Sequence, residues 1–97
     1  METTYSEFIK KLRQDSNLTY VAFGNLFNAS GQTVANWEKG HTEPSQYQLA
    51  LMSEFRRKID NIRSKSSTND IDVGKLILTV AGGVGLIAFF KWLFTED

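Results

Sequence analysis

The stretch that most constrains the fold is residues 18–44, LTYVAFGNLFNASGQTVANWEKGHTEP. It predicts two short helices joined by a tight turn and closed by a loop. Thr19 can cap the first helix, which we expect to run to Phe27. Phe23 and Phe27 lie at i, i+4 spacing, so they define one apolar face of that helix.

A turn and a second helix follow. Asn28 tolerates a positive φ at the end of the first helix, and Ser30 offers an N-cap hydroxyl for a helix over residues 31–39. Val34 and Trp37 lie at i, i+3 on its apolar face, so we expect Trp37 in the core. Gly40 can end this helix in the left-handed conformation, and Pro44 blocks its resumption before Ser45.

The outer face of the second helix is polar and carries Gln32, Thr33 and Asn36. A helix, a four-residue turn and a helix with such a face form the helix-turn-helix plan. Gln and Asn amides suit adenine N6 and N7, and a Thr methyl group suits the thymine methyl group. Ser30 and the helix N-terminus suit phosphate, and Lys39 is the nearest positive side chain.

These residues resemble the lambda-repressor-like (XRE-type) DNA-binding family, whose members read L-x-x-x-x-x-L-T, then Gly-hydrophobic-Ser, then W-E-x-G-x-x-x-P-S. The matching segments are 12–19 (LRQDSNLT), 28–30 (NAS), 37–40 (WEKG) and 44–45 (PS). The resemblance covers residues 8–55. It implies an all-α domain of four to five helices that binds double-stranded DNA as a dimer. The chain departs from the family at three positions: Asn28 for the turn Gly, Gly24 for Ala, and Tyr20 for a Gln expected to contact DNA.

Two further helices are expected on either side. Thr4 and Glu7 have capping-box spacing for a first helix from Tyr5, whose apolar stripe is Tyr5, Phe8, Ile9 and Leu12. Its other side carries Lys10, Lys11 and Arg13, either as a solvated face or as phosphate contacts. Ser45 and Gln48 repeat the capping-box spacing for the last helix, whose stripe is Leu49, Met52, Phe55, Ile59 and Ile62. The last three residues either complete the core or project beyond it and pair two protomers.

Three apolar residues in the helix after Thr19 are expected on the face away from Phe23: Val21, Ala22 and Leu26. They are either scattered surface residues or a contact patch for a protein partner. Gly24 lies in the same helix, where it costs about 1 kcal/mol relative to Ala. We expect it to let a neighbouring helix approach closely.

Residues 73–94, VGKLILTVAGGVGLIAFFKWLF, predict one transmembrane helix after a flexible linker at 64–72. A 22-residue helix is about 33 Å long, enough for a bilayer core of about 30 Å. The alternative is a buried C-terminal helix of the globular domain. Pairs of small residues at 79/83 and 81/85 suit helix pairing in lipid, although glycine is common in membrane helices. Residues 95–97 form a short tail.

Charge orients this span. Six cations precede its uncharged core 76–90, namely Arg56, Arg57, Lys58, Arg63, Lys65 and Lys75, and only Lys91 follows that core. The positive-inside rule therefore predicts a single-pass protein of the inner (cytoplasmic) membrane, with domain 1–63 in the cytoplasm. Residues 1–65 carry nine Lys and Arg against seven Asp and Glu, a net charge of +2, which is low for a nucleic-acid binder.

The sequence thus predicts a membrane-anchored, dimeric or oligomeric, sequence-specific transcription regulator. The expected DNA-contacting residues are Tyr20, Ser30, Gln32, Thr33, Asn36 and Lys39. We expect no enzyme, cofactor or metal site, because the chain has one His and no Cys, and its glycine-rich segment 82–85 lies inside the apolar span. Two alternatives remain: a membrane-anchored module that binds a protein, and a small membrane effector controlled by its helical domain.

Overall fold

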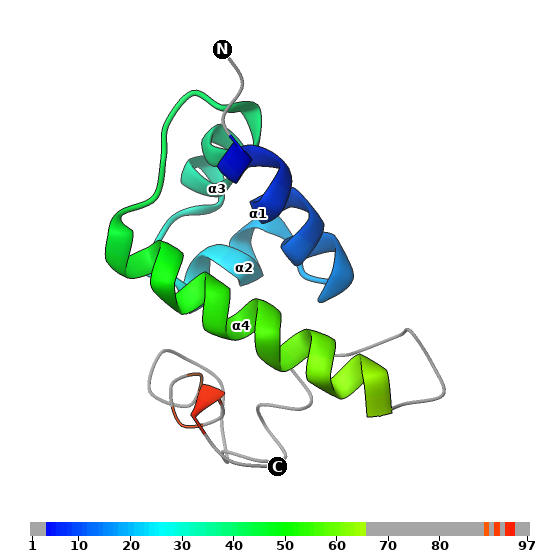
Figure 1. Cartoon of the computed structure of the whole chain (residues 1–97). Coiled ribbons are helices and arrows are strands. Elements are labelled where there is room, and N and C mark those ends of the chain that lie inside the picture. Colours follow the sequence, from blue (N-terminus) through cyan, green and yellow to red (C-terminus); the bar gives the residue numbers. More distant parts are fainter. Residues whose placement is uncertain (1–3, 66–88, 90, 92, 95–97) are drawn as a thin grey trace.

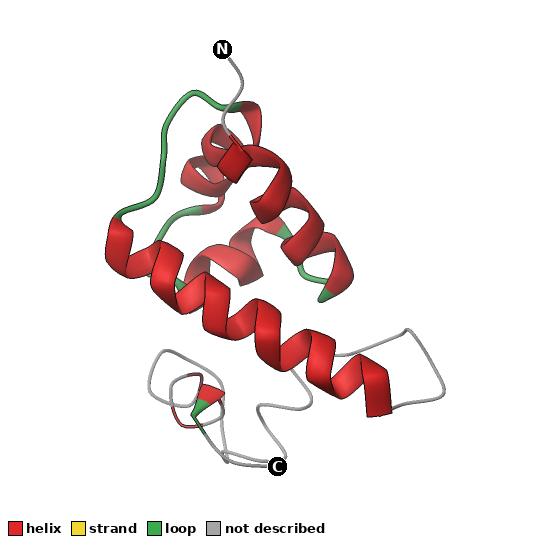
Figure 2. Cartoon of the chain, in the orientation of Figure 1, coloured by secondary structure: helices red, strands yellow, loops and turns green. Residues whose placement is uncertain are grey.

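The computed structural model describes residues 4–65, 89, 91, 93 and 94. Over these residues the chain is all-helical, with four helices and no strand: α1 (Thr4–Asp15), α2 (Tyr20–Leu26), α3 (Gly31–Lys39) and α4 (Gln46–Lys65) (Figure 2). In Figure 1, the long α4 runs below α1, α2 and α3, and the red C-terminal residues lie on its other side. The predicted all-α class is confirmed.

The caps of α2 and α3 form as predicted. Thr19 is extended, with φ −76° and ψ 169°, and its hydroxyl accepts from the Ala22 N–H at 3.1 Å. Ser30 has φ −77° and ψ 163°, and its hydroxyl accepts from the Thr33 N–H at 3.0 Å. Gly40 ends α3 at φ 79° and ψ 13°. Because each cap acts within one helical turn, local sequence is enough to place these helix ends.

The turn between α2 and α3 depends on two residues. Asn28 adopts φ 57°, the left-handed conformation that asparagine tolerates better than most side chains. Gly24 gives the turn room, since a Cβ at this position would press against Ala29 O and lie 3.1 Å from Ser30 O. The close approach expected at Gly24 therefore exists, but the neighbour is the turn backbone and not a helix.

α4 begins at a reciprocal capping box. Ser45 N–H donates to Gln48 Oε1 at 2.8 Å, and Gln48 N–H donates to Ser45 Oγ at 3.1 Å. The Gln48 amide also donates to the Phe27 carbonyl at 2.7 Å, which ties the start of α4 to the end of α2. α4 continues unbroken through Ser64 and Lys65, the first two residues of the predicted linker.

The core lies between α4 and the other helices. Its buried members from α1 to α4 are Ile9, Leu12, Phe23, Leu26, Phe27, Val34, Trp37, Leu51, Met52, Phe55 and Ile59. The core position of Trp37 is confirmed. An aromatic cluster is its centre: Phe23 and Phe27 lie 4.8 Å apart between ring centroids, and Phe55 lies 6.0 Å from Phe27.

The predicted surface position of Leu26 is wrong. Leu26 is 5% exposed and lies in the core, whereas Val21 on the same helix is 61% exposed. α2 has only seven residues and ends at Leu26, so the chain turns there. Leu26 belongs to the same buried cluster as Leu51 and lines a pocket with Tyr47 and Leu51 from the start of α4.

The far part of the last apolar stripe is also buried. Phe55 and Ile59 are fully buried within this chain, and Ile62 packs partly against the same core. Two C-terminal residues, Phe89 and Leu93, complete this side of the core. Phe55 and Ile59 therefore do not project toward a second protomer here, because the chain covers them itself.

Among the described residues, no helix has the length and apolar character needed to span a membrane. The predicted linker after residue 65 and most of the predicted span at 73–94, with its small-residue pairs, lie outside the described residues.

Candidate nucleic-acid interface

Five of the six predicted DNA-contacting residues lie on α3 or at its cap, and Tyr20 begins α2. The starts of the two helices are close neighbours. A Cβ at Gly31 would lie 2.9 Å from Val21 Cγ2 and 3.5 Å from Tyr20 Cβ. The structure therefore brings the first turn of α3 and the first residues of α2 to one surface.

The α3 residues form a hydrogen-bonded polar row. Gln32 is exposed, and its amide nitrogen donates to Asn36 Oδ1 at 3.2 Å. The hydroxyls of Ser30 and Thr33 lie 2.9 Å apart. Asn36 and Thr33 are half-buried, and Lys39 is exposed at the end of the helix. One helix face thus presents amides and hydroxyls held in place by their own neighbours.

The Tyr20 ring packs against Arg13 of α1. The Arg13 guanidinium lies 4.4 Å from the centre of the Tyr20 ring, a cation–π arrangement. Tyr20 remains 42% exposed. The guanidinium also donates to the Leu18 carbonyl at 3.2 Å, so one side chain orients the entry to α2.

Arg13 does not belong to a solvated face, which was one of its two predicted settings. Its guanidinium forms two contacts to Glu38, Nε to Oε2 at 2.6 Å and Nη2 to Oε1 at 3.1 Å. The side chains are 15% and 5% exposed, respectively. The hydrogen bonds that Arg13 donates to Glu38 raise the pKa of Arg13 against the opposing effect of burial. Glu38 therefore acts as a structural hydrogen-bonding residue between α3 and α1.

A second charged cluster joins α1 to α4 and was not predicted. Asp15 accepts from Arg56 at 3.0 Å, and Arg63 lies 3.2 Å and Lys11 3.3 Å from the same carboxylate oxygen. Arg56 also pairs with Asp60 on its own helix. These cations neutralise carboxylates of the same domain, which reduces the charge left to meet phosphate.

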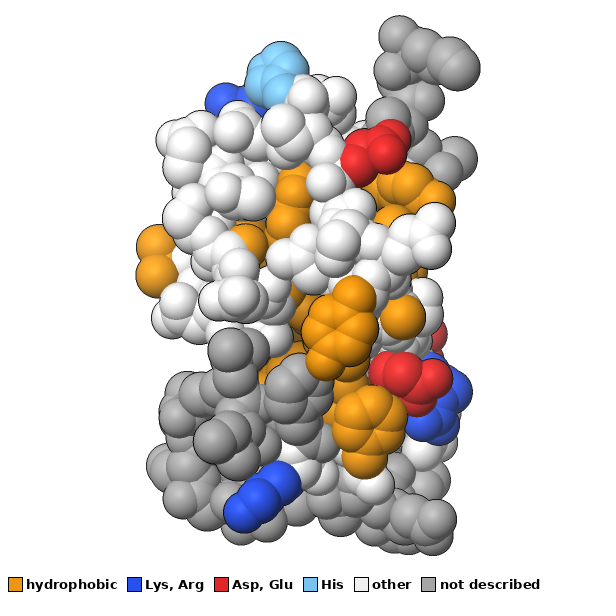
Figure 3. All heavy atoms as spheres, turned by 90° about the vertical axis from the view of Figure 1, so that its left-hand side faces the viewer, with side chains coloured by type: hydrophobic (Ala, Val, Ile, Leu, Met, Phe, Trp, Pro, Cys, Tyr) orange, Lys and Arg blue, Asp and Glu red, His pale blue; other side chains and the backbone are white. Residues whose placement is uncertain are grey.

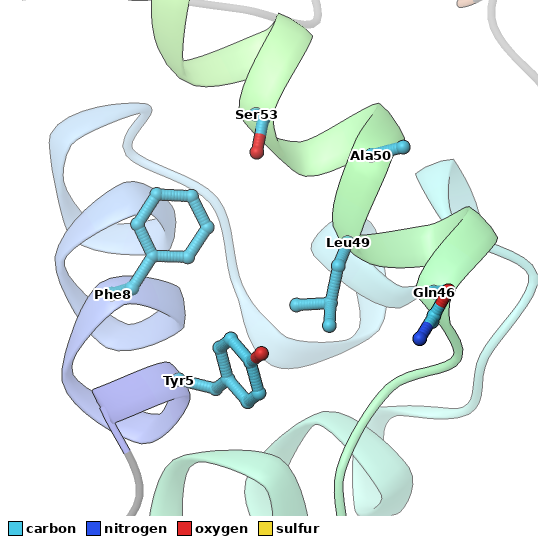
Figure 4. A pocket seen from close by; sticks show the side chains of 6 residues that line it. All are labelled: Tyr5, Phe8, Gln46, Leu49, Ala50 and Ser53. Carbon is cyan, nitrogen blue, oxygen red and sulfur yellow. The ribbon is translucent and has the colours of Figure 1, made fainter.

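A groove borders this scaffold between α1 and the start of α4. It has a volume of about 560 Å³, and in it Tyr5 and Phe8 face Leu49 (Figure 4). Its lining is mostly apolar and offers no nucleophile–base pair. Within the described part of the chain, no three His, Asp or Glu side chains gather to hold a metal ion.

One face of the molecule is poor in charge. Figure 3 shows hydrophobic side chains among uncharged polar ones there, with charged side chains at the margins. Tyr47, the most exposed large apolar residue of the four helices, is 65% exposed. Such a surface gives little electrostatic attraction to a polyanion.

Fold and site together define a small all-helical scaffold that presents one short, polar, well-capped helix. No protein-family model, curated protein or solved structure matches this chain at a significant level.

Proposed function

We propose that this chain is a membrane-anchored, sequence-specific DNA-binding protein, a transcription regulator of the lambda-repressor-like kind. In this proposal α2 and α3 are a helix-turn-helix, and α3 is the recognition helix. The observation that carries the proposal is the polar row on α3, exposed beside Tyr20 and fixed by caps and side-chain hydrogen bonds.

The hydrogen bond between Gln32 and Asn36 assigns the two amides different roles. Gln32 uses one N–H on Asn36 Oδ1, so its second N–H and its carbonyl oxygen remain for a base. One donor and one acceptor are what adenine N7 and N6 require. In this proposal Gln32 contacts the base, and Asn36 orients the Gln32 side chain.

Phosphate contacts would come from the start of α3. The Ser30 hydroxyl already accepts from Thr33 N–H, so the earlier N–H groups of the first turn are the donors for a phosphate oxygen. Lys39 at the other end of α3 and Lys10 on α1 are exposed cations. Since Arg13, Arg56 and Arg63 are engaged with carboxylates, few phosphates are neutralised and the salt dependence of binding is shallow.

The membrane anchor is the apolar stretch 73–94, with the helical domain in the cytoplasm. Its support is the charge asymmetry of the sequence: six cations, from Arg56 to Lys75, lie before the uncharged core 76–90, and Lys91 follows it. Weak affinity of one domain then rises when two anchored copies share a membrane, through effective concentration. A reporter fused after Asp97 that is active in the cytoplasm would contradict this topology.

A second candidate function is protein binding by the start of α2. Tyr20 and Val21 are 42% and 61% exposed, and an aromatic beside an aliphatic residue suits the centre of a protein interface. The near-neutral charge of residues 1–65 fits this function as well.

Selection from a random duplex library separates the two functions. The full chain in lipid nanodiscs is incubated with the library at about 50 and 200 mM salt, and retained duplexes are sequenced. Enrichment of one motif supports DNA reading. Retention without enrichment, or no retention at either salt concentration, contradicts it and leaves the Tyr20–Val21 surface as the candidate site.

A further inference from the structure

The aromatic core of the helical domain is completed by residues from the other end of the chain. The Phe89 ring stands edge-on to Phe27 and to Phe55, with both centroid distances 5.4 Å and interplanar angles of 78° and 82°. Phe89 and Leu93 are 0% and 1% exposed. Their packing matches, at these two positions, the alternative in which this stretch covers the globular domain.

The same two residues belong to the stretch that the proposed function places in a bilayer. Phe89 lies 16 residues beyond the start of the stretch at residue 73. In a continuous helix this corresponds to about 24 Å, across most of a hydrocarbon layer of about 30 Å. Phe89 therefore cannot contact Phe55 in the cytoplasm and occupy the far side of the membrane at once.

We propose that the helical domain and the membrane compete for the C-terminal segment around Phe89 and Leu93. In water Phe89 and Leu93 dock into the core cluster that holds Phe27, Phe55 and Ile59, and this cluster buries their two side chains. Membrane insertion withdraws the segment and uncovers the cluster. This inference rests on the membrane anchor of the proposed function, and it does not depend on DNA binding.

The competition follows from burial on both sides. In the docked state the segment and the cluster bury each other, which removes apolar surface from water at about 25 cal/mol per Å². Insertion offers the segment a second apolar environment, but leaves Phe55 without the Phe89 ring and leaves the cluster that holds Ile59 without Phe89 and Leu93. By thermodynamic linkage, docking lowers the affinity of the segment for lipid by a certain factor, and insertion lowers the affinity of the segment for the domain by the same factor.

A single cysteine reports on the uncovered cluster, because the chain has no cysteine of its own. Ile59 is fully buried and Ser53, also on α4, is exposed. We would compare the labelling rates of full-length I59C and S53C with a water-soluble maleimide. In buffer, I59C should react at least about tenfold more slowly than S53C, since its access requires local opening.

Removing the cover from the chain itself gives the first test. Phe89→Ala with Leu93→Ala should accelerate labelling at I59C in buffer and leave S53C unchanged. Circular dichroism checks that the helices persist, and Leu93→Ala alone serves as a milder variant if they do not. Equal I59C rates with and without the two substitutions would overturn docking.

Vesicles of phosphatidylcholine and phosphatidylglycerol give the second test. Binding of the I59C chain should either accelerate labelling or produce a disulfide between two copies, since both require an uncovered cluster. A chain that binds vesicles and keeps I59C protected overturns the competition while leaving the anchor intact. A chain that does not bind vesicles overturns the anchor and the inference with it.

Discussion

Arg13 and Glu38, 25 residues apart in the chain, form a two-contact ion pair that joins α1 to the last turn of α3. The same guanidinium packs over Tyr20 and donates to the Leu18 carbonyl. One side chain thus fixes the first residue of α2 and the end of α3 relative to α1. The geometry of the proposed recognition surface depends on this contact.

Breaking this pair on one side should be costly. Glu38→Ala removes the carboxylate that pairs with Arg13 and leaves the largely buried guanidinium charge without an ionic partner. We therefore expect a loss of about 3–5 kcal/mol in the free energy of unfolding. Replacing both residues by apolar ones of similar size, R13M with E38L, should cost less than the single change. Urea denaturation measures both values, and a double variant less stable than E38A would contradict this account.

Gly24 should not accept a side chain, although it lies in a helix. Alanine normally stabilises a helix interior by about 1 kcal/mol relative to glycine. Here the added Cβ would meet the backbone of Ala29 and Ser30, which cannot rotate away, so Gly24→Ala should destabilise the chain by about 1–3 kcal/mol. Gly31→Ala is a milder comparison, since its Cβ would lie 2.9 Å from Val21 Cγ2 and 3.3 Å from Val21 N, farther from backbone than the Cβ at Gly24, and it should destabilise the chain less. A stabilising Gly24→Ala would show that the turn has room to shift.

Asp15 should make the free energy of unfolding depend on pH in the acidic range. Burial raises the pKa of this carboxyl, but hydrogen bonds from Arg56 and Lys11 outweigh it, and the pKa lies below its usual value. A depressed pKa contributes stability above the ordinary Asp value of about 4, and that contribution is lost as the pH falls through the folded-state pKa. Asp15→Asn should lower the urea midpoint at pH 7 and reduce its fall between about pH 4 and pH 2. Equal slopes in the variant and the parent chain would contradict this role.

Local signals in the sequence predicted most of the helical scaffold. Thr19, Ser30, Asn28 and Gly40 each act within one turn of the backbone they cap or bend, so neighbours in sequence carry the whole interaction. The bounds of α3 were predicted from Ser30 and Gly40 and agree with the structure. The predicted polar face of Gln32 and Asn36 followed from helical spacing alone.

Long-range contacts were harder to predict. Arg13 looked like one of three cations on an outer face, because nothing local indicates that Glu38 approaches it from 25 residues away. Leu26 was placed outside because helical periodicity takes no account of the chain turning at the end of a seven-residue helix. The stretch containing Phe89 was apolar enough for a bilayer, and its fit to the Phe27–Phe55 pair depends on the assembled core.

The central claim is that Gln32 reads a base, and one comparison tests it most directly. We would measure fluorescence anisotropy for the selected duplex and a scrambled duplex with the full chain in nanodiscs, using wild type, Gln32→Ala and Gln46→Ala. Gln46 is an exposed glutamine at the start of α4, outside the proposed interface. Gln32→Ala should lose about 1–3 kcal/mol of discrimination, roughly 5- to 150-fold, and Gln46→Ala should keep it. Equal discrimination by wild type and Gln32→Ala, or no duplex binding by folded wild type at low salt, would contradict the account.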